Sequence, residues 1–195
     1  MDMLTILLIR TGATEYACQA RIQGTLDIPL SEDGREHVEK VIQQLRGQQV
    51  DAIYAGPCRA TQQTAEHLSE PLQLKPKTID KLSNLNLGLW QGMLLDDVKV
   101  KQPKVYRQWQ EHPETVCPPD GETLQAVRER LEQALAKIVK KHKLGVVAMV
   151  LPEPVRSVMR TVLRETDTLG NLWDLECENQ PAWELIEVTP RVASL

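Results

Sequence analysis

The stretch Leu4-Thr5-Ile6-Leu7-Leu8-Ile9-Arg10-Thr11-Gly12 decides how this sequence folds. It is an apolar run that ends in a basic residue, a hydroxyl and a glycine. Strands of a parallel sheet are buried on both faces and have such nearly continuous apolar sequences. The carboxyl ends of these strands are where α/β proteins build their sites, so Arg10 and Thr11 are the first candidate site residues.

Apolar strands and amphipathic helices alternate along the rest of the chain. The pattern predicts strands at 50–54, 145–151 and 183–188, a further short strand within 72–79, and helices that begin near residues 31, 60, 123 and 152. The helix that begins near residue 60 is expected to stop before Pro71, because proline disfavours helical backbone in the residue before it. Strands separated by helices predict a three-layer α/β/α sandwich with a mainly parallel central sheet.

The chain, residues 1–195, is predicted to form one domain. Within it, residues at about 82–119 contain four prolines and are expected to form an irregular insertion over the carboxyl edge of the sheet. A domain of this length can bury roughly 70% of its extended-chain surface, which is enough for an ordinary core.

Composition excludes several classes of function. The net charge of −4 argues against non-specific binding of nucleic acid, which needs a basic surface. No apolar run reaches the ~18 residues of a membrane span, and no signal peptide is expected. We expect a cytoplasmic protein whose four cysteines, Cys18, Cys58, Cys117 and Cys177, are reduced thiols. No His/Asp/Glu cluster has metal-ligand spacing, so we expect no metal and no cofactor.

Five further segments carry a resemblance to a known family. They are 21–31 followed by Gly34, 54–65, 82–92 with Gly88, Trp90 and Gly92, 119–123, and 146–155. In their order and spacing, and together with Arg10-Thr11-Gly12, these segments resemble the motifs of the histidine phosphatase (phosphoglycerate mutase-like) superfamily. The resemblance spans nearly the whole chain and implies a phosphoglycerate mutase-like fold.

The resemblance also implies a chemistry, phosphoryl transfer through a phosphohistidine. In that family a neutral imidazole attacks phosphorus while two arginines and a second histidine surround the phosphoryl oxygens. A carboxylic acid protonates the leaving oxygen. Such a site therefore needs an unprotonated nucleophile, a clamp for the developing charge, and an acid.

Four of the five core positions of that family hold other residue types in this sequence. Arg10 matches the first clamp arginine. The remaining positions fall on Thr11 for the nucleophile, Ala60 for the second clamp arginine, Asn84 for the acid and Pro152 for the second histidine. Arg59 lies one residue early, and on a helix a slip of one residue turns a side chain by about 100°.

The four histidines offer no obvious replacement. His37 and His67 fall on predicted helices, where we expect them to be solvated or capping. His112 lies in the insertion, and His142 at the basic end of the long helix. Cys58 follows a turn beside the expected pocket, where Arg59 could favour a thiolate, although a bystander thiol is the simpler interpretation.

The leading hypothesis is a catalytically inactive member of this superfamily, which binds a phosphorylated or other anionic ligand, or a protein partner. The candidate ligand-binding residues are Arg10, Thr11, Arg59 and Asn84, with homodimerisation left open. The alternative is a residual or altered phosphatase or mutase that uses Arg10 with Thr11, Cys58 or residues of the insertion. A third interpretation is an interaction module in which the old pocket is filled core.

Overall fold

The computed structural model describes residues 3–166, 181–189 and 192. Its centre is a five-stranded sheet in the order β3-β2-β4-β1-β5. The strands are β1 (Leu4–Arg10), β2 (Ala52–Ala55), β3 (Lys77–Thr78), β4 (Gly145–Leu151) and β5 (Trp183–Glu187). Pairing is parallel throughout except between β1 and the edge strand β5. The predicted, mainly parallel sheet is confirmed.

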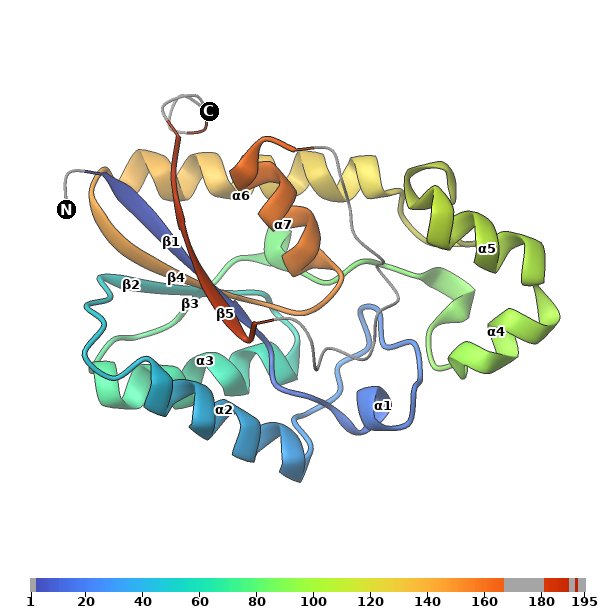
Figure 1. Cartoon of the computed structure of the whole chain (residues 1–195), viewed down its shortest axis with the longest axis horizontal. Coiled ribbons are helices and arrows are strands. Elements are labelled where there is room, and N and C mark those ends of the chain that lie inside the picture. Colours follow the sequence, from blue (N-terminus) through green and yellow to red (C-terminus); the bar gives the residue numbers. More distant parts are fainter. Residues whose placement is uncertain (1–2, 167–180, 190–191, 193–195) are drawn as a thin grey trace.

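Strand β1 lies between β4 and β5 and is covered on both faces. Leu4, Ile6 and Leu8 enter one apolar cluster with α6 (Leu124–Lys141) and α7 (Val155–Arg164). Leu7 and Ile9 enter another, with α2 (Glu32–Gln44) and α3 (Arg59–Leu72). Figure 1 shows the same three layers, with α6 and α7 above the sheet and α2 and α3 below it. Because both faces are buried, the strand has no polar face, and its sequence is apolar without alternation.

Helices α2 and α6 begin where their capping residues predict. Ser31 accepts a hydrogen bond from the Gly34 N–H at the start of α2, and Thr123 accepts one from Ala126 at the start of α6. Each side chain satisfies an N–H that has no partner within the helix. The basic residues Lys140 and Lys141 lie in the last turn of α6, where the helix dipole favours positive charge.

Helix α3 departs from the prediction, because it continues through Pro71 to Leu72. Proline removes one hydrogen bond from a helix interior and was therefore expected to end this one. Here Pro71 is exposed and lies in the final turn, where the carbonyl that loses its partner can meet water. The helix ends at Gln73, which adopts the left-handed conformation with φ 53°.

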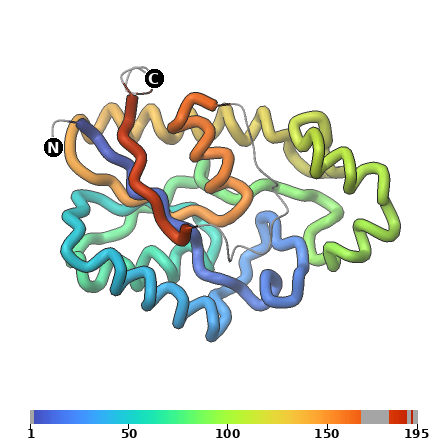
Figure 2. The backbone as a smooth tube through the Cα atoms, in the orientation of Figure 1, coloured from blue at the N-terminus to red at the C-terminus, as the bar shows by residue number. Residues whose placement is uncertain are grey.

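The segment at about 82–119 is more regular than predicted. It contains α4 (Leu95–Lys101), α5 (Pro103–Glu111) and the short 3-10 helices η2 (Gly88–Trp90) and η3 (Pro113–Thr115), following η1 (Asp80–Leu82). Pro103 begins α5, a position where its missing N–H costs nothing. Figure 2 shows the α4–α5 stretch lying beyond the N-terminal end of α6. The rings of Trp90 and Trp109 pack edge to face inside this segment, with centroids 5.7 Å apart.

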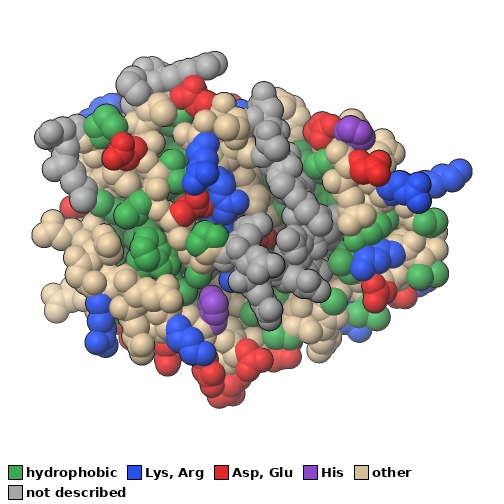
Figure 3. Space-filling view, in the orientation of Figure 1, with side chains coloured by type: hydrophobic (Ala, Val, Ile, Leu, Met, Phe, Trp, Pro, Cys, Tyr) green, Lys and Arg blue, Asp and Glu red, His purple; other side chains and the backbone are tan. Residues whose placement is uncertain are grey.

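The surface carries charges of both signs. On the face shown in Figure 3, basic and acidic side chains are interspersed rather than gathered into a patch of one sign. None of the helices that the structure describes is long and apolar enough to cross a membrane.

Candidate functional site

A cavity of about 330 Å³ opens at the carboxyl ends of β1 and β4. Its polar lining comprises Arg10, Thr11, Thr14, Arg21, Gln23, Asp33, His37, Asn84 and Glu153. Its apolar lining includes Ile22, Leu87, Trp109, Pro152 and Pro154. The short helix α1 (Glu15–Cys18) lies on the loop that follows β1 and contributes Ala17. The volume falls in the range of pockets that hold small molecules.

Four of the five core positions implied by the family resemblance meet at this cavity. Thr11, Asn84 and Pro152 line it together with Arg10. Arg10 and Thr11 reach it because β1 ends there: their backbone N–H groups donate to the Ala182 and Leu151 carbonyls, each at 2.9 Å. Strands β1 and β4 are adjacent, so their carboxyl ends share one edge of the sheet.

Ala60 and Arg59 do not line the cavity. Ala60 is buried against Leu30 and Val38. Arg59 is exposed at the first position of α3, and its backbone N–H donates to the Asp27 carboxylate at 2.7 Å. Arg59 is not among the described residues that line the cavity, so a ligand contact by Arg59 stays a prediction.

Thr11 is hydrogen-bonded to a second hydroxyl. Its Oγ1 atom lies 3.0 Å from Oγ1 of Thr61, on the first turn of α3. Thr61 Oγ1 lies 2.8 Å from Sγ of Cys58, the N-cap residue of that helix. Nearby, the Gly12 N–H donates to Thr64 Oγ1 at 3.1 Å. A hydroxyl is not a base at neutral pH, so Thr61 by itself does not activate Thr11 as a nucleophile.

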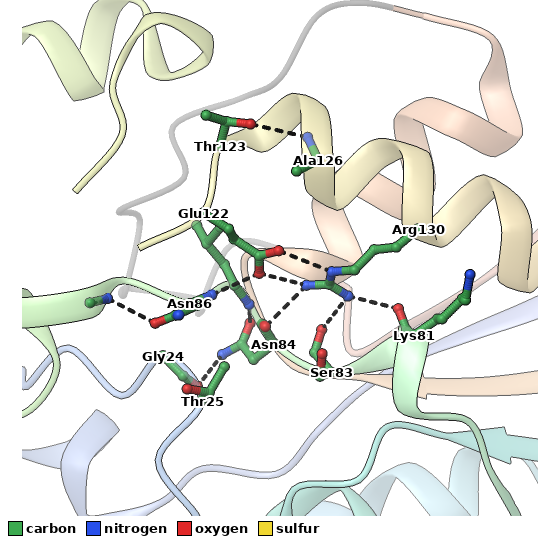
Figure 4. A network of polar contacts seen from close by, with 12 residues as sticks. Gly24, Thr25, Lys81, Ser83, Asn84, Asn86, Glu122, Thr123, Ala126 and Arg130 are labelled. Carbon is green, nitrogen blue, oxygen red and sulfur yellow. Dashed lines mark hydrogen bonds and ion pairs between the residues drawn. The ribbon is translucent and has the colours of Figure 1, made fainter. Parts of the chain in front are cut away.

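Asn84 is held in place by both ends of its amide. Its Nδ2 donates to the Gly24 carbonyl at 3.0 Å, and its Oδ1 accepts from the Leu85 N–H at 2.9 Å. The bond to Gly24 ties the segment before η2 to the loop after β1, as Figure 4 shows, and the bond from Leu85 fixes the orientation of the amide within its own segment. An amide in this arrangement can donate a hydrogen bond but cannot deliver a proton to a leaving group.

A network around Arg130 fixes the backbone on which Asn84 sits (Figure 4). The Arg130 guanidinium donates to the carbonyls of Lys81, Ser83 and Asn84 at 2.7, 2.8 and 3.1 Å. It also forms a two-point pair with the Glu122 carboxylate, at 2.9 and 3.2 Å. Glu122 in turn accepts from the Asn86 N–H at 2.8 Å. One guanidinium thus satisfies three backbone carbonyls of an irregular segment, where no helix or sheet supplies hydrogen bonds to them.

The turn after β4 carries a carboxylate into the cavity. Glu153 Oε2 accepts from the Ser157 N–H at 3.1 Å and from the Ser157 hydroxyl at 2.8 Å, at the N-terminus of α7. Glu153 Oε1 pairs with Arg156 Nη1 at 3.1 Å. Arg156 is fully buried, and its Nη2 donates to the Pro181 carbonyl at 2.8 Å. Burial lowers the pKa of Arg156, while the carboxylates of Glu153 and Glu184 oppose that shift.

His37 is exposed on α2, as expected of a solvated residue, and it also contributes to the lining of the cavity. Partial burial lowers its pKa, and the positive charges of Arg10 and Lys40 lower it further. The imidazole is therefore neutral near pH 7. Helix α2 comes this close because Gly34 lacks a side chain: a Cβ there would lie 2.1 Å from the Ala13 carbonyl oxygen.

Sequence reasoning missed four charged or titratable lining residues: Arg21, Asp33, His37 and Glu153. Helix α2 is the first long helix after β1, and the chain leaves β1 at the carboxyl edge of the sheet, so the first turns of α2 could have been assigned to the site. No comparable pattern in the sequence assigned Glu153 or Arg21 to the site. Among the residues that the structure describes, no group of three or more His, Cys, Asp or Glu side chains is arranged to hold a metal ion. Cys177 lies outside the described residues, and the other three cysteines are free thiols.

The sequence pattern of the histidine phosphatase superfamily (branch 1) matches residues 6–193, and the chain belongs to this superfamily. It is 31% identical over 177 residues to phosphoserine phosphatase 1 of Hydrogenobacter thermophilus, covering 91% of this chain and 83% of that protein. It is 27% identical over 146 residues to phosphoglycerate mutase-like protein 4 of Arabidopsis thaliana, covering 73% of this chain and 64% of that protein.

The fold is shared with solved structures. YhfR of Bacillus stearothermophilus superposes with a TM-score of 0.84 at 26% identity, covering 96% of this chain and 92% of that one. The predicted phosphoglycerate mutase-like α/β fold is thereby confirmed, with a mostly parallel sheet flanked by helices.

Proposed function

We propose that this protein is a member of the histidine phosphatase superfamily that binds an anionic small molecule without phosphohistidine chemistry. The observation that carries the proposal is the makeup of one cavity, in which Arg10 is joined by Thr11, Asn84 and Pro152. The family resemblance places the nucleophile, the acid and the second histidine at these last three positions.

The chemical argument rests on what each side chain can do. A threonine hydroxyl is almost wholly protonated at neutral pH and needs an adjacent base. An asparagine has no proton to give, and a proline offers neither charge nor a donor. Loss of a nucleophile alone lowers turnover by several orders of magnitude in well-studied hydrolases. Arg10 keeps its value for binding, because a guanidinium fork fits the oxygens of a carboxylate or phosphate.

A second candidate function is an altered phosphomonoesterase, and the comparisons favour it over the first. The relative with 31% identity is named a phosphoserine phosphatase, which supports hydrolysis of a phosphomonoester. Two features of the cavity would serve such an enzyme. His37 supplies a neutral imidazole at its rim, and the Cys58–Thr61–Thr11 chain links the Thr11 hydroxyl to a thiol.

Phosphate release from a panel of phosphomonoesters separates the two candidates. The proteins compared are the wild type, Thr11→Val, His37→Gln and Cys58→Ala, each with its melting temperature measured to confirm folding. Binding is followed in parallel by the rise in melting temperature that an anionic ligand produces by mass action.

We expect stabilisation by anions with no release above background in any of the four proteins. Release by the wild type that is lost in Thr11→Val, His37→Gln or Cys58→Ala would establish the phosphomonoesterase and refute the non-catalytic proposal. If no protein releases phosphate and no anion raises the melting temperature, both candidate functions are refuted and a protein-interaction role is left.

A further inference from the structure

A group of side chains from three elements meets at the C-terminal end of α6. Lys77 lies on the edge strand β3, and Tyr54 pairs with it on β2. Lys141 is the last residue of α6, and His142 is its C-cap. Figure 1 shows this end of α6 on the opposite side of the molecule from α5, which supplies Trp109 to the cavity. None of the four residues is among the described lining of the cavity, so they form a separate group.

Two aromatic rings form the base of this group. Tyr54 is buried, and its hydroxyl lies 3.0 Å from Nε2 of His142. The two rings pack edge to face, with centroids 5.8 Å apart. Nζ of Lys77 lies over the Tyr54 ring, 5.5 Å from its centroid, where the face of the ring attracts a cation. The ammonium group of Lys77 is therefore positioned by a buried ring, although the residue is exposed.

The positioned ammonium group of Lys77 lies within hydrogen-bonding reach of Lys141. An ammonium group donates hydrogen bonds and accepts none, so two charged lysines cannot satisfy each other. Their like charges also repel. The dipole of α6 favours one cation at this end, Lys141, but it does not explain why β3 brings a second one into contact with it. The contact becomes favourable when both lysines share an acceptor that carries negative charge.

No carboxylate in the described parts of the chain serves as that acceptor. Neither Lys77 nor Lys141 forms an ion pair there. Asp51 acts on His142 through its charge, but its carboxylate is bonded to the backbone: Oδ2 accepts from the Val146 N–H at 2.8 Å. The described residues therefore leave the charge of the two lysines to be neutralised from outside the chain.

We propose that Lys77 and Lys141 bind one phosphate group between them, at a site separate from the cavity. Two ammonium groups match the charge of a phosphate dianion, and their N–H donors can turn toward its tetrahedrally arranged oxygens. Because one lysine lies on β3 and the other on α6, the bound phosphate joins the edge strand of the sheet to the helix above it. The site does not depend on the proposed function.

Proton NMR of the histidine rings tests this site, with inorganic phosphate as the probe. His142 reports on the two lysines and His37 on the cavity, and the variants His142→Gln and His37→Gln assign the two signals. Burial and the charges of Lys77 and Lys141 lower the pKa of His142, while Asp51 opposes them, so a bound phosphate should raise that pKa. Chloride at equal ionic strength is the reference, since salt alone screens the lysines.

The proteins compared are the wild type, Lys77→Gln, Lys141→Gln and, as a matched control, Lys104→Gln. All three lysines are exposed, and Lys104 lies on α5, away from His142. We expect phosphate to raise the pKa of His142 saturably in the wild type and the control. Each of the other two variants should bind phosphate about fivefold more weakly, a loss typical of one exposed charge-assisted hydrogen bond.

A measurement without phosphate checks the placement of the lysines. The pKa of His142 should already be higher in Lys77→Gln and Lys141→Gln than in the wild type, because each variant removes a charge that lowers it. An unchanged pKa in both variants would contradict the contact on which the proposal rests.

A response of His142 to phosphate no larger than that to chloride, or one that persists in both lysine variants, would overturn the proposal. A response of His37 alone would also overturn it, while supporting anion binding at the cavity. A response of His142 alone would support the lysine site and count against phosphate binding at the cavity. A parallel titration with ethyl phosphate identifies the source of the group: tighter binding than inorganic phosphate indicates a phosphate ester, and weaker binding indicates free phosphate.

Discussion

The hydroxyls of Thr11 and Thr61 lie 3.0 Å apart and join the end of β1 to the first turn of α3. Thr61 is completely buried and is also 2.8 Å from Sγ of Cys58. The contact places a side-chain hydrogen bond at the position where the family resemblance implies a nucleophile. Thr11 thus has a structural role, linking two layers of the fold, that does not depend on catalysis.

Replacement of Thr61 by valine keeps the shape of the side chain but removes its hydroxyl. The Thr11 hydroxyl and the Cys58 thiol then lose a buried hydrogen-bond partner, which should destabilise the protein by about 1–2 kcal/mol. Thr61→Ser keeps the hydroxyl and should cost less. Urea unfolding of both variants measures the difference. Equal stability of Thr61→Val and the wild type would show that this chain of side chains contributes nothing to the fold.

Arg130→Met should cost about 3 kcal/mol, since it leaves the Glu122 carboxylate and three carbonyls without their shared donor. Arg35→Met is the matched control, because Arg35 is exposed on α2 and should change stability by less than about 0.5 kcal/mol. The loss of order around Asn84 should also weaken ligand binding in Arg130→Met. Chemical denaturation with both variants, followed by ligand titration, tests the two effects separately.

Gly34→Ala should destabilise the protein by about 3 kcal/mol and abolish ligand binding, because the new Cβ would force α2 away from the loop after β1. The contact is with backbone, the Ala13 carbonyl oxygen at 2.1 Å, which cannot rotate out of the way. Gly47→Ala is the control. Gly47 has φ +87° but nothing within 4 Å, so it should cost only about 1 kcal/mol of backbone strain and leave binding intact.

Ligand affinity should rise as the pH falls, through His37. In the free protein its pKa is held below the ordinary value of about 6.5 by burial, Arg10 and Lys40, with Asp33 as the carboxylate on the same stretch of lining. A bound anion raises that pKa, so binding takes up a proton. Affinity is then highest below the pKa of the free protein and falls as the pH rises through the pKa of the complex.

Calorimetry with phenylacetate between about pH 5.5 and 8 measures this dependence, because a carboxylate ligand stays ionised over most of that range. His37→Gln should flatten the profile. His142→Gln should leave it unchanged, since His142 is bonded to Tyr54 at the far end of α6. If the affinity of the wild type does not change with pH, His37 does not take part in ligand binding.

The framework of the fold could be read from the sequence because it depends on local signals. An apolar run with a polar end predicts β1, and the hydroxyls of Ser31 and Thr123 mark where two helices begin. The helices α4 and α5 were missed because four prolines suggested irregular backbone, although Pro103 serves as the first residue of α5. A proline at a helix start and one that breaks a helix look alike in a sequence.

The candidate site was predictable only where it lies at strand ends. Arg10 is the last residue of β1, and Thr11 and Pro152 directly follow β1 and β4, so their meeting follows from the parallel pairing. His37 and Glu153 reach the site through tertiary contacts. His37 does so because α2 packs closely on the loop after β1 at Gly34, and Glu153 because its carboxylate turns back onto the N-terminus of α7. Such contacts depend on packing between elements, which the local pattern does not encode.

Strand β1 is among the first segments of the chain, yet its neighbours β4 and β5 are among the last. Pairings between segments so far apart in sequence close large loops and slow folding. An apolar strand must therefore remain unpaired until most of the chain has been made, which exposes it to aggregation. The walls of the cavity, with Arg10 bonded to Ala182 and Thr11 to Leu151, assemble only at the end of this sequence of events. A ligand that fills the cavity can stabilise only a chain that has completed it.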